Sequence, residues 1–209
     1  MLILRATKSK DINMFKITKA MAEKGDAKAQ FNVGWMYDNG IAVTQNKVEA
    51  VKWYHFAAEQ GNANAQFHLG VMYHCGTGVA EDDVEAVKWY RLAADQGDVD
   101  AQYNLGLMYS NGEGVAQNFV EAVKWFHFAA DQGLADAQYN LGVMYANGEG
   151  VAQNDVEAVK WYRLAADQGI AEAQNNLGNM YANGTGVARN DVQAYKWYRL
   201  AANKQKINK

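Results

Sequence analysis

A spacing of 36 residues dominates this sequence. An Ala-Gln pair recurs at that spacing five times, and a tryptophan keeps the same spacing along the chain. Repeats of this length are typical of stacked supersecondary units, each of which buries its apolar face only against a neighbouring copy. The chain is therefore predicted to be a one-dimensional array. The pairs begin at Ala29, Ala65, Ala101, Ala137 and Ala173, and the tryptophans are Trp53, Trp89, Trp125, Trp161 and Trp197.

The first half of each copy has the pattern of an amphipathic helix. In the first copy, Gln30, Val33, Gly34 and Tyr37 fall at the i, i+3, i+4, i+7 spacing of one helical face, although Gln30 itself is polar. An Asn-Gly pair follows at 39–40, and its glycine suits the left-handed conformation that ends many helices. The pair recurs at 111–112, 147–148 and 183–184.

The second half of each copy begins with a capping signal. In the fourth copy, Asn154 can cap free backbone amides, and Glu157 can reach back to the amide of Asn154 in a capping box. Because the chain has no proline and few alternating apolar runs, no sheet is expected and the fold is predicted to be all-α. The same device recurs as Asn46 with Glu49, Asp82 with Glu85, Asn118 with Glu121 and, in a variant form, Asn190 with Gln193.

A glycine lies inside the first helix of every copy, where it costs about 1 kcal/mol relative to Ala. Its repetition implies a packing reason, so a facing helix is expected to cross too closely for a Cβ. Tyr37, Trp53 and Tyr54 are expected to fill the space between consecutive helix pairs, which places the tryptophan series in the core. These glycines are Gly34, Gly70, Gly106, Gly142 and Gly178.

The shared pattern AxAQYNLGxMYxNGxGVxQNDxxAxxWYRxAAxQG resembles the Sel-one-like repeat, a relative of the tetratricopeptide repeat, over about residues 11–203. The tetratricopeptide repeat itself fits less well because of the 36-residue period, the long connector and the missing proline. The resemblance implies a right-handed α-solenoid of antiparallel helix pairs. It also implies a non-enzymatic adaptor or scaffold that binds other proteins, in bacterial signalling, secretion or host interaction and in eukaryotic membrane-protein degradation.

The copies give the boundaries of the predicted domains. Residues 11–15 align with residues 83–87, so a leading helix is expected upstream of the first full repeat. The expected order is a flexible segment at 1–10, the leading helix at 11–26, repeats at 27–62, 63–98, 99–134, 135–170 and 171–203, and a basic tail at 204–209.

Three varying positions of the first helix, spaced i, i+4, i+7, share one face. By analogy with helical repeat proteins this face lines the concave surface, where aromatic side chains are typical anchors for a peptide or helix of a partner. The alternative is that Phe31 and its counterparts only join neighbouring copies, and that Asn175 takes their place in the last copy because it lacks a neighbour. We call this set the variable face: Phe31, Trp35, Asp38, Phe67, Val71, His74, Tyr103, Leu107, Ser110, Tyr139 and Val143.

Composition excludes several other classes of partner. A net charge of -3 and a pI near 5.8 offer no basic patch for nucleic acid or for an anionic membrane. No apolar run approaches the roughly 20 residues of a membrane span, and the apolar run at residues 2–4 is too short for a signal peptide. Cys75 is the single cysteine, so a reducing, cytoplasmic location is expected, although a chain whose signal had been removed would look the same.

Candidate chemical groups are sparse. His68, His74 and Cys75 could share one helix end, as a nucleophile or a metal site would require, but Cys75 replaces the Asn of an Asn-Gly pair and drift within one copy explains it. The acids at 81–83 precede a helix, where they favour its dipole. We therefore expect no catalytic residue, metal or cofactor. A cysteine-rich, secreted branch of the resembled family is associated with β-lactam binding or hydrolysis, but its disulfide in each repeat is missing here.

Two further surfaces complete the expectations. The second helix carries His or Arg followed four residues later by an acid or Asn, as in Arg163 and Asp167, which indicates a solvated outer face. Tyr195 replaces the usual Val in the last copy, so weak self-association is expected through an open end formed by Tyr195 and Trp197.

Overall fold

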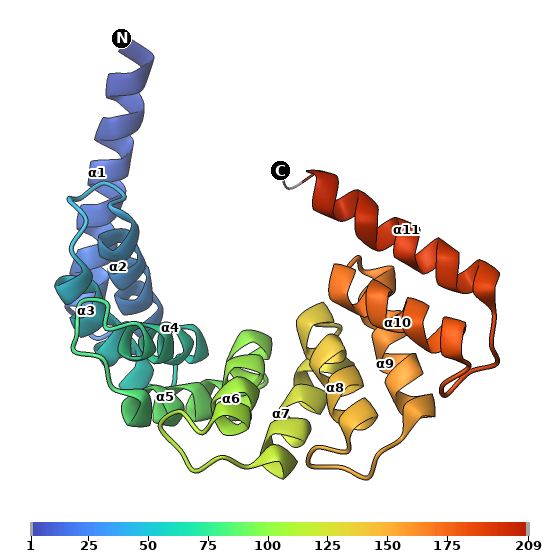
Figure 1. Ribbon diagram of the computed structural model, residues 1–209. Helices are drawn as coiled ribbons and strands as arrows, with labels where there is room; N and C mark the ends of the chain where they lie inside the picture. The colour runs from blue at the N-terminus through green and yellow to red at the C-terminus, as the bar shows by residue number, and fades with distance from the viewer. Residues whose placement is uncertain (1, 208–209) are drawn as a thin grey trace. The chain divides into compact units, whose positions relative to one another are not determined.

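The structure is a computed structural model that describes the backbone of residues 2–207 and the side chains of residues 12–203 (Figure 1). Over this part of the chain every regular element is a helix and no strand occurs, which confirms the predicted all-α class. The helices are α1 (Leu2–Ala22), α2 (Ala27–Asn39), α3 (Lys47–Glu59), α4 (Ala63–His74), α5 (Asp83–Asp95), α6 (Val99–Asn111), α7 (Phe119–Asp131), α8 (Ala135–Asn147), α9 (Asp155–Asp167), α10 (Ala171–Asn183) and α11 (Asp191–Ile207).

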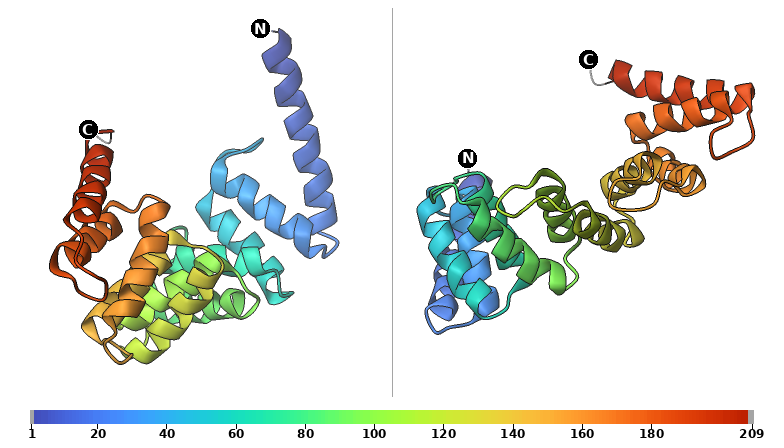
Figure 2. Two further views of the ribbon diagram at one scale, coloured as in Figure 1. Left: turned by 90° about the vertical axis from the view of Figure 1, so that its right-hand side faces the viewer. Right: turned by 60° about the horizontal axis from the view of Figure 1, so that its bottom comes forward.

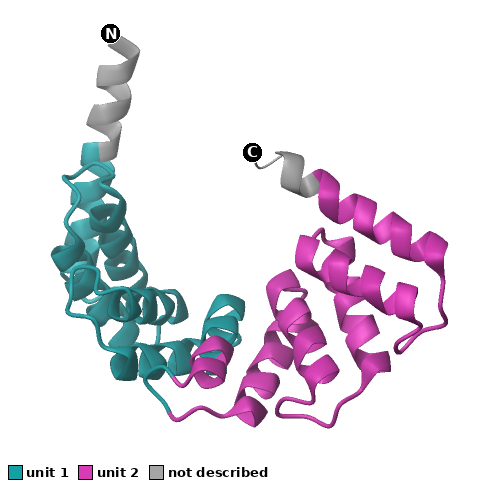
Figure 3. Ribbon diagram, in the orientation of Figure 1, with its two compact units in different colours: residues 1–105, 113–115 teal, residues 106–112, 116–209 magenta. Residues whose placement is uncertain are grey.

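The chain divides into two compact units, each an array of adjacent helices (Figure 3). Unit 1 comprises residues 1–105 and 113–115, and unit 2 comprises residues 106–112 and 116–209. Within each unit, consecutive helices lie side by side (Figure 2). The two helices of one repeat pack most extensively, and the second helix of a repeat also packs against the first helix of the next.

The helical glycines do mark a close approach, as expected, but an aromatic ring from the second helix of the same repeat is what comes close. A Cβ on Gly34 would lie 2.7 Å from Cδ1 of Tyr54, and one on Gly70 would lie 2.5 Å from Cδ1 of Tyr90. Both rings are buried. Tyr54 therefore packs first inside its own helix pair, rather than only between consecutive pairs.

The tryptophan series lies against the core. Trp125 and Trp197 are buried, whereas Trp53 is half-buried and packs against Ala22 and Val33. Trp89 on α5 packs in the same way against the buried residues of α3 and α4. Each of these two indoles therefore helps to join its own repeat to the helices before it.

The N-caps form, but the expected capping box is only half present. The side chain of Asn46 accepts a hydrogen bond from the backbone N–H of Glu49 at 3.1 Å. The carboxylate of Glu49 does not reach back, because it binds Nζ of Lys52 at 2.6 Å. The backbone N–H of Asn46 instead donates to the carbonyl of Tyr37 at 2.9 Å, since the connector folds back onto the end of the first helix.

A buried glutamine explains the polar position in the apolar stripe. Gln66 is buried, its amide nitrogen donates to the carbonyl of Ala58 at 3.0 Å, and its amide oxygen accepts from Nε2 of Gln96 at 2.7 Å. The first bond reaches the preceding repeat, so a satisfied polar side chain joins the copies and fixes their register. Gln30 and Gln138 repeat the same two bonds.

The connector makes a second junction between repeats. Gly150, with φ of 71°, lies against the carbonyl of Phe119, the first residue of the second helix in the preceding repeat. A Cβ at this position would collide with that carbonyl. Ala42 occupies the equivalent place in the first repeat with φ of 62°, and it is the one non-glycine residue with positive φ that the described backbone contains.

The expectations for the two ends of the chain concern residues 1–10 and 204–209, whose side chains lie outside the described residues. The leading helix α1 begins at Leu2, upstream of the boundary expected at residue 11. None of the helices in the described part of the chain has both the length and the apolar character needed to cross a bilayer.

Candidate functional site

The variable face is partly exposed and partly used in packing. Trp35 is 42% exposed on α2, which makes it the most accessible aromatic side chain of the set. Phe31 is half-buried, and its ring lies 5.7 Å from the rings of both Tyr54 and His68. Phe31 therefore contacts both α3 and α4, whereas Trp35 on the same helix is open to solvent.

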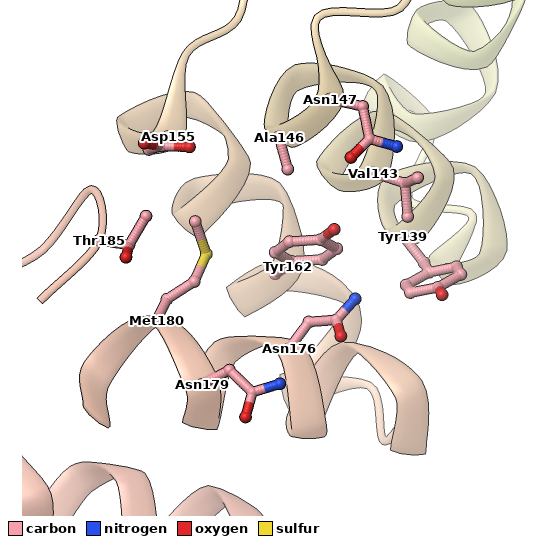
Figure 4. Close-up of a pocket in the computed structure, with 10 residues that line it drawn as sticks. All are labelled: Tyr139, Val143, Ala146, Asn147, Asp155, Tyr162, Asn176, Asn179, Met180 and Thr185. Atoms are coloured by element: carbon pink, nitrogen blue, oxygen red, sulfur yellow. The ribbon is translucent and has the colours of Figure 1, made fainter. Parts of the chain in front are cut away.

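In unit 2, part of the variable face lines a groove between α8 and α10 (Figure 4). The groove has a volume of about 480 Å³. Val143 and Ala146 of α8 line one side, Asn176 and Asn179 of α10 line another, and the ring of Tyr162 of α9 lies between them. Tyr139, Asn147, Asp155, Met180 and Thr185 complete the lining.

The ring of Tyr162 reaches the groove because Gly142 leaves room for it. A Cβ on Gly142 would lie 2.5 Å from Cδ1 of that ring. Burial raises the pKa of Tyr162 to about 12, although a hydrogen bond from Asn176 acts in the opposite direction. At neutral pH the phenol therefore keeps its proton, and the groove presents neutral hydroxyl and amide groups.

A smaller groove of about 210 Å³ lies one repeat earlier in the same unit. Its lining residues include Leu107 and Ser110 of α6, Phe126 of α7 and Asn140 of α8. These positions are equivalent to Val143, Ala146, Tyr162 and Asn176 one repeat later. Unit 2 thus contains two copies of one groove, and the earlier copy has a phenyl ring where the later one has a phenol.

The equivalent positions of unit 1 carry pairs of an acidic and a basic side chain. Nζ of Lys47 lies 2.6 Å from Oδ1 of Asp38, and the hydroxyl of Tyr54 donates to Oδ2 of Asp38 at 3.3 Å. Oδ1 of Asp83 lies 2.7 Å from Nδ1 of His74. His68 stacks on Tyr54 with a centroid distance of 5.1 Å and an angle of 8°, and burial lowers the pKa of this imidazole. Two members of the variable face, Asp38 and His74, are therefore engaged by the second helix of their own repeat.

The candidate chemical groups do not assemble into a catalytic arrangement. Cys75 is a free, exposed thiol at the end of α4, while His68 stacks on Tyr54 and His74 pairs with Asp83. Within the described residues, no three His, Cys, Asp or Glu side chains gather as a metal site requires. Each candidate histidine thus has a packing or pairing partner of its own.

The outer face of the second helices is solvated at many positions, as expected, but some of its side chains also contact the next repeat. His55 is half-buried and lies 3.1 Å from the hydroxyl of Tyr73 in the next repeat, and burial lowers its pKa. Nη2 of Arg163 donates to the hydroxyl of Tyr181 at 2.5 Å instead of pairing with Asp167. These side chains bridge repeats, because each reaches the tyrosine hydroxyl of the following first helix.

Sequence reasoning also missed an apolar row on this outer face. Phe56 and Leu92 in unit 1 are 51% and 47% exposed, and Phe128 and Leu164 in unit 2 are 46% and 47% exposed. Their 36-residue spacing was the available signal. Of the two residues expected to form an open end in the last repeat, Trp197 is buried and Tyr195 is 67% exposed.

Tyr162, Asp155 and Asn176 fall outside the variable face because comparison of the copies selects positions of the first helices that vary, whereas the groove draws on α8, α9 and α10. Tyr162 is equivalent to Tyr54, to which the sequence gives a packing role. The recurrence of these groove residues at 36-residue spacing was visible, but only the three-dimensional arrangement brings them together around one groove.

The Sel1 repeat family matches this chain at residues 27–62, 63–98, 99–134, 135–170 and 171–206. No curated protein matches. Among solved structures, a protective antigen of uropathogenic Escherichia coli with an SLR fold is 43% identical at a TM-score of 0.87, and the match covers 91% of this chain but only 41% of that one. A Sel1 repeat protein from Oxalobacter formigenes is 36% identical at a TM-score of 0.84, with 95% and 84% of the two chains covered.

A third solved structure shows the same fold at lower identity. This putative Sel1 repeat protein from Klebsiella pneumoniae is 22% identical at a TM-score of 0.53, and the match covers 93% of this chain and 99% of that one. The similar structures described here come from bacteria.

Proposed function

Because this chain belongs to the Sel1 repeat family, whose members are generally protein-interaction scaffolds, we propose that it is a non-enzymatic scaffold or adaptor. In this proposal, a peptide or helix of a partner protein binds the face that the first helices of the repeats form. The partner contacts the variable face and the grooves beside it.

The observation that carries the proposal is the groove between α8 and α10. It is about 480 Å³ in volume, a size within the range of ligand sites, and it combines aromatic rings with amide groups. Rings supply apolar contact area, while Asn176 and Asn179 can hydrogen-bond to the main chain of an extended segment. A related groove precedes it by one repeat, so a partner that follows the array meets the same arrangement twice.

Exposed Trp35 supports a contact in unit 1 as well. A large aromatic side chain that is 42% exposed beside a packed surface is a typical anchor for a partner. The bridging role of Phe31 makes this residue a poorer anchor, because its removal would also loosen the contact between α2 and α4.

The test is partner capture followed by measured binding. Wild-type protein, the double variant Trp35→Ala/Phe67→Ala and the groove-filling variant Ala146→Phe are used as baits, and captured proteins are then purified and titrated by calorimetry. We expect a partner whose affinity falls at least about tenfold with Ala146→Phe or the double variant, since hot-spot changes of about 1.4 kcal/mol or more are common.

Lys160→Ala is the matched control, because Lys160 lies exposed on the outer face of α9. Circular dichroism and thermal unfolding confirm that each variant is folded. A partner that binds the two face variants as tightly as wild type, or that is lost with Lys160→Ala instead, contradicts the proposal.

A further inference from the structure

One pair of positions recurs in every repeat and carries an ionisable residue in all repeats except the third, which has Ser110 and Phe119. The first position is in the last turn of the first helix, and the second is the first residue of the second helix, nine residues later. In the first repeat Asp38 pairs with Lys47 at 2.6 Å, and in the second His74 pairs with Asp83 at 2.7 Å. The acidic residue is at the first position in one repeat and at the second position in the other, and in both repeats a basic side chain of the same repeat lies beside it.

The fourth repeat breaks this pattern. Its pair is Ala146 and Asp155, so the carboxylate lacks the imidazole that His74 provides for Asp83 two repeats earlier. Within residues 12–203, the side chain of Asp155 has no hydrogen-bond or ion-pair partner. In the fifth repeat the pair is Ala182 and Asp191, but there Nε of Arg189 lies 3.1 Å from Oδ1 of Asp191.

The unpaired carboxylate of Asp155 lies beside an open groove. Asp155 is half-buried and lines the groove of about 480 Å³ together with Ala146 and Tyr162 (Figure 4). The residue equivalent to Arg189 is Gln153, whose amide donates to the carbonyl of Ala146 at 3.0 Å and brings no charge. The groove therefore has one anionic group in a lining that is otherwise neutral.

We propose that this end of the groove accepts a lysine or arginine side chain from an extended segment of the partner. The cationic group lies at the carboxylate of Asp155, and the aliphatic stem lies over Ala146 and the ring of Tyr162, where long basic side chains pack favourably. Asn176 and Asn179, on the other side of the ring, bind the main chain of the same segment (Figure 4). The inference rests on the proposed function and specifies the chemistry of the partner.

The test uses synthetic peptides and the full chain. Acetylated, amidated pentapeptides Ala-Ala-X-Ala-Ala, with X as lysine, norleucine or glutamate, are titrated into nitrogen-15-labelled protein, and the shifts of the Asn176 and Asn179 side-chain amides are followed. We expect the lysine peptide to bind at least about fivefold more tightly than the norleucine peptide, as for a favourable ion pair, and the glutamate peptide to bind most weakly.

Two variants locate the charge effect. Asp155→Asn removes the anion, and Ala146→His rebuilds inside the fourth repeat the pair that His74 and Asp83 make in the second. Both are expected to abolish the preference for lysine over norleucine. Asp191→Asn is the matched control, because Asp191 has the equivalent place in the next repeat, and it is expected to leave the preference intact.

The outcomes separate the two proposals. If lysine and norleucine peptides shift the Asn176 and Asn179 amides with equal affinity, the groove binds a segment but the basic-residue inference is overturned, and Asp155 serves only the dipole of α9. If no peptide shifts these amides, both the inference and the groove part of the proposed function are overturned. Equal loss with Asp191→Asn also overturns the inference.

Discussion

The ring of Tyr162 lies over Gly142 so closely that a Cβ on this glycine would come within 2.5 Å of Cδ1 of the ring. The same relationship joins a helical glycine to an aromatic ring in every repeat, so it is a property of the repeating unit. In unit 2 it also forms the site, because the ring that the glycine admits lines the groove between α8 and α10. Packing and the candidate function thus depend on the same pair of residues.

Replacing Gly142 by alanine is expected to destabilise the protein by about 1 to 3 kcal/mol, the usual cost of overpacking. Helix propensity alone predicts the opposite, a gain of about 1 kcal/mol. Urea unfolding measures the difference. The control is the same substitution in a Tyr162→Leu background, where the clash is relieved and Gly142→Ala should cost less. A Gly142→Ala protein more stable than wild type would show that the ring yields without strain.

Two loop glycines allow the cost of a positive φ to be measured apart from the cost of a steric clash. Gly150 and Gly133 both have positive φ, at 71° and 95°, but a Cβ would meet a backbone carbonyl at Gly150 and nothing within 4 Å at Gly133. Gly133→Ala is expected to cost about 1 to 2 kcal/mol from the left-handed conformation alone. Gly150→Ala should cost clearly more, because the backbone of two repeats must also move apart. Equal losses in denaturant unfolding would contradict a tight junction at Gly150.

Two tryptophans are expected to differ in their contribution to stability. Trp125 is 4% exposed in the core of unit 2, so Trp125→Ala should lower the free energy of unfolding by about 3 to 5 kcal/mol. Trp35 is 42% exposed, so Trp35→Ala should cost less than about 1 kcal/mol, as surface changes usually do. Thermal and denaturant unfolding of the two variants provide the comparison. A larger loss for Trp35→Ala would reassign the variable face to the core.

The fold was predictable from the sequence because the strongest signals are local and occur five times. Asn46 signals the start of a helix by itself, and the cost of Gly34 in a helix implies a close neighbour without showing which one. The direction of the Glu49 side chain was not predictable, because it depends on Lys52 beside it and on the fold of the connector, which offers the Tyr37 carbonyl to the cap amide.

The candidate site was only partly predictable for a related reason. The variable face follows from helical periodicity, which places its members without any knowledge of packing. The groove requires α8, α9 and α10 together, and the role of Asp155 depends on what its neighbours lack. Comparison of the copies shows that Ala146 has replaced His74, but only the structure shows that this replacement leaves a carboxylate facing open space.

Stability is expected to fall in mild acid partly because of His68. Its imidazole stacks on Tyr54, and burial lowers its pKa below the ordinary 6.5, although the charges of Asp38 and Asp98 act in the opposite direction. Above about pH 6.5 the imidazole is neutral in both states. Between that value and the lower pKa of the folded state, the unfolded chain binds more protons, so the free energy of unfolding decreases as the pH falls.

The variant His68→Asn isolates this contribution. Asparagine occupies the equivalent position in later repeats, at residues 104, 140 and 176, and His55 is present in both proteins. Urea unfolding at pH 7.5 and pH 5, at constant ionic strength, gives the loss of stability for each protein. The wild type is expected to lose more than His68→Asn over this interval. If the variant loses as much, or if the wild type gains stability, then the protonated imidazole is accommodated against Tyr54 in the folded state, and the burial of His68 does not control its protonation.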